Sequence, residues 1–421
     1  MPDRRRFRVV PVRLESPSGS EVLPTLIDAD TWLPPSMALR WVMRSRRWEC
    51  MPSTLSGNLR AVALLYQWAD LSLGHDLDAF LDEGALLTGA QIDSLVVYLR
   101  TRVAQEEIAR LPPRSVSTLG TLGVVARPVR NLLKWAADPQ TRGGAGYIDP
   151  VELSGYRRRL DTLFAPAVVR HGQTQRIRPL SEVEDQRLRE LVSPIADAEG
   201  HGLFPLRFRR DNPFVPRNRL RNWLMYQIAR ELGFRRSEIL AIWISDIDAG
   251  PPPHLNLRRR PNDPADTRRE PAAVKRGERS LPTSDLLRAG IKMYQTTRWP
   301  VGRQTVKFPF LLAASTSRQP LSVRAASHAI EVLGRAAHIP DLSWHSLRHT
   351  WAEEIAVDLL AQYGGDEDRC LALLCELGGW SHTSPTPKHY IQNALRREAW
   401  IFQEVRARQL WRVAGPVEGR R

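Results

Sequence analysis

The chain has 421 residues, of which 42% are hydrophobic, so it can build packed cores and is not a disordered protein. Its formal net charge of +15 and its sequence pI of about 10.4 favour a polyanionic partner, with nucleic acid ahead of an acidic membrane surface. The length exceeds that of one ordinary domain and suggests two or three. Arginine carries nearly all the basic charge, which suits phosphate binding, although a high-GC genome would also enrich arginine.

The cysteines Cys50, Cys370 and Cys375 indicate no disulfide framework, and no Cys/His set has zinc spacing. The N-terminal residues lack the apolar run of a signal peptide, and no stretch approaches the apolar length of a membrane span. We therefore expect a cytoplasmic, nucleoid-associated protein with no metal, no cofactor and no membrane association.

The N-terminal part predicts an arm followed by a helical domain. Residues 1–29 suggest an irregular arm with at most a short strand at 7–13. Apolar residues then recur at helical spacing, for example over 59–69, 90–106 and 114–137, so we expect a domain of four or five helices over 30–165. The polar, basic segment that follows predicts an interdomain linker at 166–179.

The C-terminal part predicts a second domain over 180–421. Ser181 and Glu184 have the spacing of a capping box that opens a helix. A helix over 222–231 should end at Gly233, and short strands at 254–257 and 279–281 should form a β-hairpin with a long loop. The fold class is therefore mainly α with a small β-hairpin or sheet in the C-terminal domain, an α+β architecture. The arginine-rich stretch 207–221 fits either a solvated surface or phosphate contacts.

Two parts of this domain carry candidate chemistry. His345, Arg348 and His349 stand at i, i+3 and i+4, so on a helix they share one face, which suits a bound phosphate. Tyr390 follows and could act as a nucleophile. Arg235 falls at the turn before a helix, where a side chain and helix N-terminal N–H groups can address one anion.

These residues could cleave a phosphodiester without metal. Arg235 and Arg348 suit the two non-bridging oxygens, and His345 suits proton handling. Lys275, in the hairpin loop, can protonate a leaving 5′ hydroxyl. Tyr390 would form a reversible ester, because a phenol with a pKa near ~10 is itself a fair leaving group. Each residue alone is weak evidence, and only the ordered set carries the hypothesis.

The ordered set resembles the tyrosine recombinase, or phage integrase, family. Gly233-Phe234-Arg235-Arg236-Ser237-Glu238-Ile239-Leu240 is similar to the first arginine box of the family, and Lys275 before Arg279-Ser280-Leu281-Pro282 resembles its hairpin lysine. His345-Ser346-Leu347-Arg348-His349-Thr350 and Leu377-Gly378-Gly379-Trp380 with Tyr390-Ile391 resemble the later boxes. The resemblance covers about residues 180–410, and 30–165 resembles more loosely the core-binding domain of the family.

The resemblance implies a site-specific recombinase whose two domains clamp double-stranded DNA. It implies a covalent 3′-phosphotyrosine, a released 5′ hydroxyl that attacks the partner strand, and a homo-tetramer across two DNA sites. Related recombinases or accessory DNA-bending proteins could also take part. The implied catalytic residues are Arg235, Lys275, His345, Arg348, Trp380 and Tyr390, with His382, His349 and Glu238 as candidates for an assisting role.

This chain departs from the family pattern near the tyrosine. Trp380 stands where most members have histidine, and His382 could be the assisting donor in its place. The loop 381–389 is longer than usual and contains two prolines, and 351–376 is also extended. Both departures bear on the pose of Tyr390. The final helical pattern, 391–412, could pack on its own domain or dock on a neighbouring protomer.

Other functions fit part of the pattern. A type IB topoisomerase-like enzyme uses similar chemistry but reseals the same strand, and a DNA-binding regulator could retain a decayed site. The complete ordered set argues against decay, and the lack of a recognisable acidic triad argues against a carboxylate-dependent transposase.

Overall fold

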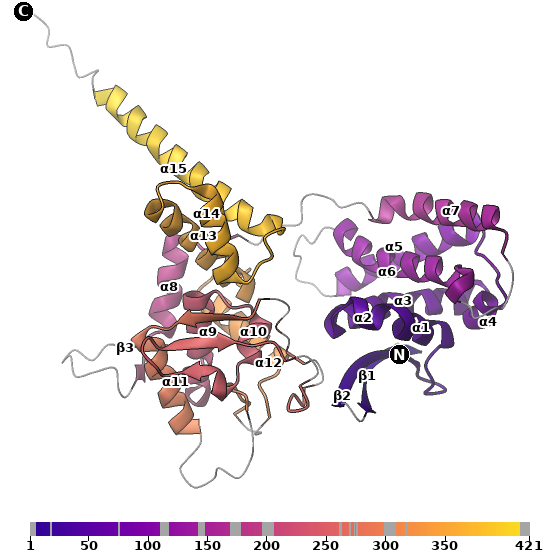
Figure 1. Cartoon of the computed structure of the whole chain (residues 1–421), viewed down its shortest axis with the longest axis horizontal. Coiled ribbons are helices and arrows are strands. Elements are labelled where there is room, and N and C mark those ends of the chain that lie inside the picture. The colour runs from indigo at the N-terminus through magenta and orange to yellow at the C-terminus, as the bar shows by residue number, and fades with distance from the viewer. Residues whose placement is uncertain are drawn as a thin grey trace, which may run out of the picture. The chain divides into compact units, whose positions relative to one another are not determined.

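In a computed structural model the chain divides into two compact units, residues 1–176 and 177–421 (Figure 1). The structure describes residues 6–16, 19–74, 76–109, 118–141, 148–168, 178–195, 206–260, 263–268, 271–272, 274, 277–298, 309–315 and 319–412. Lys275 and most of the predicted linker lie outside these residues. Among the helices described, none is long and apolar enough to cross a membrane.

The first unit opens with a β-hairpin instead of the irregular arm expected from the sequence. Strands β1 (Phe7–Ser16) and β2 (Gly19–Asp28) pair antiparallel, from Phe7 opposite Asp28 to Ser16 opposite Gly19. The short strand expected at 7–13 is part of β1, whereas β2 was not expected. Strand β2 contains Pro24, opposite Pro11, and a proline argues against a strand. The hairpin is held to the unit because buried Phe7 and Leu23 join its core.

Helices form the rest of this unit. Four long helices, α3, α5, α6 and α7, surround a core that includes buried Leu59, Trp68, Tyr156 and Phe164. Their bounds are α1 Ser36–Trp41, a π-helical turn η1 Val42–Arg46, α2 Arg47–Glu49, α3 Pro52–Ser72, α4 Leu77–Asp82, α5 Gly89–Ala109, α6 Thr118–Ala136, η2 Pro139–Thr141 and α7 Pro150–Val168.

The second unit begins with the predicted capping box, in which Ser181 and Glu184 satisfy each other's backbone at the start of α8. The predicted hairpin is also confirmed: β6 pairs with β7, and β5 extends the sheet to three strands in the order β5-β6-β7. The bounds are α8 Glu182–Val192, β3 Pro194–Ile195, β4 Arg207–Phe208, η3 Pro216–Asn218, α9 Arg219–Leu232, α10 Arg236–Ala241, η4 Ile244–Asp246, β5 Ile247–Asp248, β6 His254–Leu257, β7 Arg279–Pro282, α11 Asp285–Arg298, α12 Val323–Ala336, α13 Trp344–Gln362, α14 Glu367–Gly378 and α15 Pro385–Arg412.

Helix α13 connects the two hydrophobic clusters of this unit. Its first turn joins the cluster of α9, α11 and α12 through Trp344 and Leu347. From Trp351 onward it packs with α14 and the first turns of α15, where Tyr390 and Ile391 are buried. The mainly helical α+β fold is thus confirmed. Helix α13 places its basic residues between the turn that joins α9 to α10, which contains Arg235, and the start of α15.

Candidate active site

Glycine at 233 allows the sharp turn that presents Arg235. Helix α9 ends at Gly233 with φ +63°, in the left-handed region, and an added Cβ would lie 2.2 Å from the Trp351 indole. Both the backbone angle and the space therefore require glycine. Two residues later Arg235 is the N-cap residue of α10, and its side chain remains partly exposed.

Glu238 holds this arginine from inside the protein. Its carboxylate has no exposed surface and accepts hydrogen bonds from Arg235 Nη1 (2.6 Å) and from Arg279 Nη2 (2.9 Å). Arg279 is itself buried, with its guanidinium over the Phe234 ring. Burial acts to raise the pKa of Glu238, but Arg279 and Arg235 outweigh it and lower the pKa, so the carboxylate stays charged.

Arg348 is buried on α13 without a carboxylate partner among the contacts described. It is 3% exposed, and its two terminal nitrogens donate to the carbonyl oxygens of Gly233 and Gly378. Its guanidinium carbon lies 4.0 Å from the centre of the Trp380 ring, a cation–π distance. Burial, followed by the charge of Arg235, lowers the pKa of Arg348 to about 9. Such a cation is well suited to bind an incoming anion.

Trp380 lies at the centre of the site. The guanidinium carbon of Arg235 is 5.9 Å from its ring centre, and the Tyr390 ring is 5.7 Å away. The ring has room because residue 378 is glycine, where a Cβ would stand 1.8 Å from the indole. One indole therefore contacts or approaches both arginines and the tyrosine.

Tyr390 lies in the second turn of α15 and is 5% exposed. Its Oη is 2.6 Å from Nδ1 of His349 on α13. Burial raises the pKa of Tyr390 to about 12, even though Arg348 acts to lower it. The phenol is therefore protonated at neutral pH, beside two guanidinium groups.

The predicted residues that the structure describes divide into two groups. Arg235, Arg348, His349, Trp380 and Tyr390 come together around the indole, with Glu238 behind Arg235. His345 is exposed one turn before His349, with ring centres 6.3 Å apart, and His382 is exposed on the loop after Trp380.

Lys275 itself is not described, but the end of its hairpin loop is. Gly277 has φ +68°, and a Cβ there would lie 2.9 Å from Cα of Gly379, next to Trp380. The described end of the loop therefore touches the segment that carries the indole.

Arg279 is a site residue that the sequence prediction missed. The available signal was the two-residue spacing of Arg279 and Leu281, which places both on the buried side of the predicted strand. A charge on that side needs a buried partner. Glu238 is that partner.

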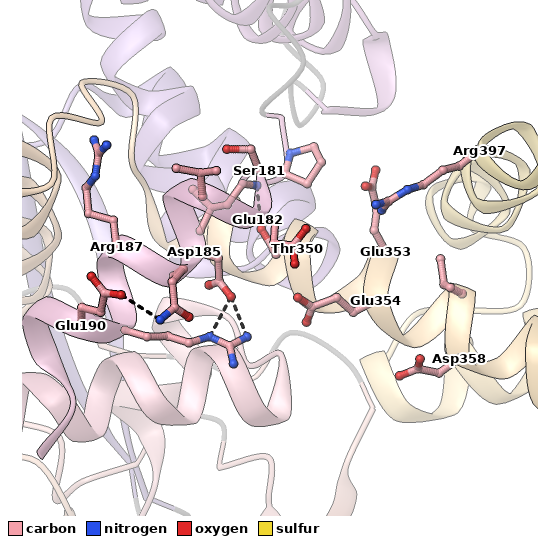
Figure 2. Close-up of a pocket in the computed structure, with 16 residues that line it drawn as sticks. Ser181, Glu182, Asp185, Arg187, Glu190, Thr350, Glu353, Glu354, Asp358 and Arg397 are labelled. Carbon is pink, nitrogen blue, oxygen red and sulfur yellow. Dashed lines mark hydrogen bonds and ion pairs between the residues drawn. The ribbon is translucent and has the colours of Figure 1, made fainter. Parts of the chain in front are cut away.

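A groove of about 1040 Å³ lies on another part of the same unit, between α8, α13 and α15 (Figure 2). Its lining is mainly acidic and would repel a phosphate backbone. Thr350 closes one side, where its hydroxyl accepts a hydrogen bond from the backbone of Leu180. The charged lining residues are Glu182, Asp185, Glu190, Glu353, Glu354 and Asp358 against Arg187, Arg189 and Arg397.

Two arginines around a buried tyrosine, with a histidine on its hydroxyl, form an arrangement that is suited to phosphoryl transfer through a tyrosine nucleophile. Residues 211–397, which include every residue of this centre, match the model of the phage integrase family. The predicted class of enzyme, a tyrosine-type site-specific recombinase, is thereby confirmed.

Solved structures with similarity to the chain include two DNA complexes. One is the XerH site-specific recombinase bound to palindromic difH substrate in a post-cleavage complex, with 15% identity, a TM-score of 0.39 and coverage of 74% of this chain and 97% of that one. Another is the Tn1549 transposon integrase in complex with transposon right end DNA, with 13% identity, a TM-score of 0.38 and coverage of 80% and 98%. No curated protein sequence matches the chain.

Proposed function

We propose that the protein recombines double-stranded DNA at specific sites through a covalent 3′-phosphotyrosine at Tyr390. The observation that carries this proposal is a buried tyrosine whose ring packs on Trp380, an indole that also covers Arg348. The charge of +15 agrees with a nucleic-acid partner. In this proposal the domain over 180–421 holds the chemistry, and residues 30–165, joined by the linker 166–179, grip the DNA in the nucleoid.

Arg235 and Arg348 bind the two non-bridging oxygens of the scissile phosphate. Both guanidinium groups lie within 6 Å of one indole ring, at 5.9 and 4.0 Å, which supports a shared anion. Trp380 is the assisting donor through its indole N–H. Its contacts with Arg348 and Tyr390 favour it over His382, which is exposed. His345 is exposed one turn before His349 on α13, and it contacts the bound DNA.

The reaction then proceeds in two reversible steps. Tyr390 Oη forms a bond to phosphorus while the bond from phosphorus to the 5′ oxygen breaks, and Lys275 gives that oxygen a proton. After strand exchange, the 5′ hydroxyl of the partner strand attacks the phosphotyrosine and releases the phenol. The ester conserves the bond energy, so neither ATP nor water is consumed.

Strand transfer between two duplexes separates this function from a topoisomerase. The assay uses two duplexes that carry the recognised site and different labels. We expect a hybrid product that carries both labels. An enzyme of the type IB topoisomerase kind would relax supercoiled DNA and yield only the parental duplexes. Appearance of covalent complex with relaxation but no hybrid would contradict the recombinase proposal.

Helix α15 supports assembly into a homo-tetramer. Residues 396–409 are exposed along the second half of the helix, which projects from α13 and α14 (Figure 1). This half carries Trp400 (74% exposed), Ile401, Phe402 (66% exposed) and Val405. An apolar surface of this kind marks a protein contact, and we propose that it docks on the neighbouring protomer.

We expect the double variant Trp400→Ser, Phe402→Ser to fold and cleave a single half-site but to lose the tetrameric complex. Both side chains are exposed, so the free energy of unfolding should change by less than about 1 kcal/mol. The measurement is the mass of the protein–DNA complex on paired sites, by light scattering. Val183→Ser, an exposed apolar residue on α8, is the matched control. A normal tetramer in the double variant would refute the role of α15.

A further inference from the structure

His349 makes the closest polar contact to the proposed nucleophile among the residues described. Its Nδ1 lies 2.6 Å from Tyr390 Oη, and the ring centres are 5.6 Å apart. The contact joins α13 to α15, which pack together in one hydrophobic cluster. The position of the imidazole is therefore set by the packing of the two helices that carry the site.

Burial and the charges around His349 keep its ring neutral before DNA binds. Burial, then His345 and Arg348 on the same helix, lower the pKa of His349 to about 4. Tyr390 faces it from α15, and Glu353 and Arg235 act on that tyrosine from α13 and α10. A neutral imidazole beside a protonated phenol can accept its hydrogen bond at Nδ1.

A bound phosphate changes this balance. Arg348 is a buried cation without a carboxylate in contact, and its charge is one of the causes that hold His349 neutral. A phosphodiester held by Arg348 brings a compensating negative charge to the same place, so the protonated imidazole becomes easier to form. The imidazole is therefore a better proton acceptor once DNA occupies the site, and the phenol proton can pass to it as Tyr390 Oη bonds to phosphorus.

From this geometry, and on the basis of the proposed function, we propose that His349 is the general base for Tyr390, activated by the phosphate of the bound strand. As Tyr390 Oη bonds to phosphorus, its proton passes to Nδ1 of His349, and the 5′ oxygen leaves with a proton from Lys275. In the reverse step the protonated His349 returns its proton to the phenol. The sequence points to His345 as the proton handler, whereas the histidine that contacts Tyr390 Oη is His349, one turn further along α13.

The test measures single-turnover formation of the covalent complex on a nicked DNA substrate. We expect His349→Ala to slow it by roughly 100-fold or more, the usual effect of removing a general base. His349→Gln can keep a hydrogen bond to the phenol but cannot take its proton, so it should remain slow. His389→Ala, an exposed histidine next to Tyr390 on α15, should match the wild type.

Two readouts distinguish a base from a structural residue. The rate of wild type should level off with rising pH, whereas the rate of His349→Ala should continue to climb through the neutral range, since hydroxide must replace the base. A substrate with sulfur at the 5′ bridging position has a leaving group that needs no acid. This substrate should restore the cleavage rate of Lys275→Ala, whereas the cleavage rate of His349→Ala should remain low.

Three results would overturn the inference: a near-normal rate for His349→Ala, full recovery by His349→Gln, or full recovery of His349→Ala with the sulfur substrate. Failure of the proposed function looks different. In that case Tyr390→Phe would still form the adduct, or wild type would form none.

Discussion

Arg348→Ala should lower the rate of DNA cleavage by about 10³ or more, each factor of ten being ~1.4 kcal/mol of barrier. The reason is that Arg348 is buried next to Trp380 and Tyr390, where water cannot replace its charge on the phosphate. Arg348→Lys should recover only part of the rate, because an ammonium cannot donate to the carbonyls of Gly233 and Gly378 and also hold phosphate in a planar grip.

The measurement is single-turnover cleavage at saturating DNA, together with DNA affinity and the unfolding transition. Arg369→Ala provides the matched control, because Arg369 is exposed on α14 and contacts Tyr363 away from the site. The variant Arg348→Ala should still bind DNA, since the net charge of +15 leaves many other basic residues to attract the phosphate backbone. Cleavage within tenfold of wild type would exclude Arg348 as a clamp on the scissile phosphate.

Glu238→Gln should destabilise the protein by roughly 3–5 kcal/mol, the usual cost of removing one partner of a buried ion pair. Glutamine has the same shape but leaves Arg279, which is buried, and Arg235 without a compensating charge. Cleavage should fall as well, because Glu238 sets the direction of the Arg235 side chain. Urea unfolding measures the first effect, with Glu331→Gln on the exposed side of α12 as control.

The same carboxylate predicts a dependence of stability on pH. Because the pKa of Glu238 in the folded protein is below its ordinary value of 4.5, the ion pair stabilises the protein above that value. This contribution is lost as the pH falls through the lowered folded pKa. Wild type should therefore lose stability on acidification over this window by more than Glu238→Gln does. Parallel pH profiles for the two proteins would contradict the assignment.

Local signals in the sequence were sufficient to predict much of the secondary structure of the second unit, residues 177–421. The glycine after α9, the capping box of α8 and the alternation in β6 and β7 each depend on neighbouring residues, and each prediction is confirmed. The spacing of His345, Arg348 and His349 placed them on one face of a helix if the segment was helical, and the segment lies in helix α13. These features follow from local backbone preferences and periodicity.

Features that depend on distant packing were not predicted. The contact of His349 with Tyr390 joins residues 41 positions apart and exists only because α13 and α15 pack together. Arg279 reaches Glu238 across 41 positions through the β-hairpin. The second strand of the β1–β2 hairpin was missed, and it contains Pro24, a residue type that usually argues against a strand.

Tyr390 should form a covalent bond to DNA. A nicked DNA substrate that loses its short 5′-hydroxyl fragment after cleavage traps this complex, and digestion followed by mass spectrometry identifies the modified residue. We predict that wild type and Tyr363→Phe form the adduct in the presence of a metal chelator, that the nucleotide is attached to Tyr390, and that Tyr390→Phe forms none. An adduct of normal yield with Tyr390→Phe, or a nucleotide attached to another residue, would contradict the account.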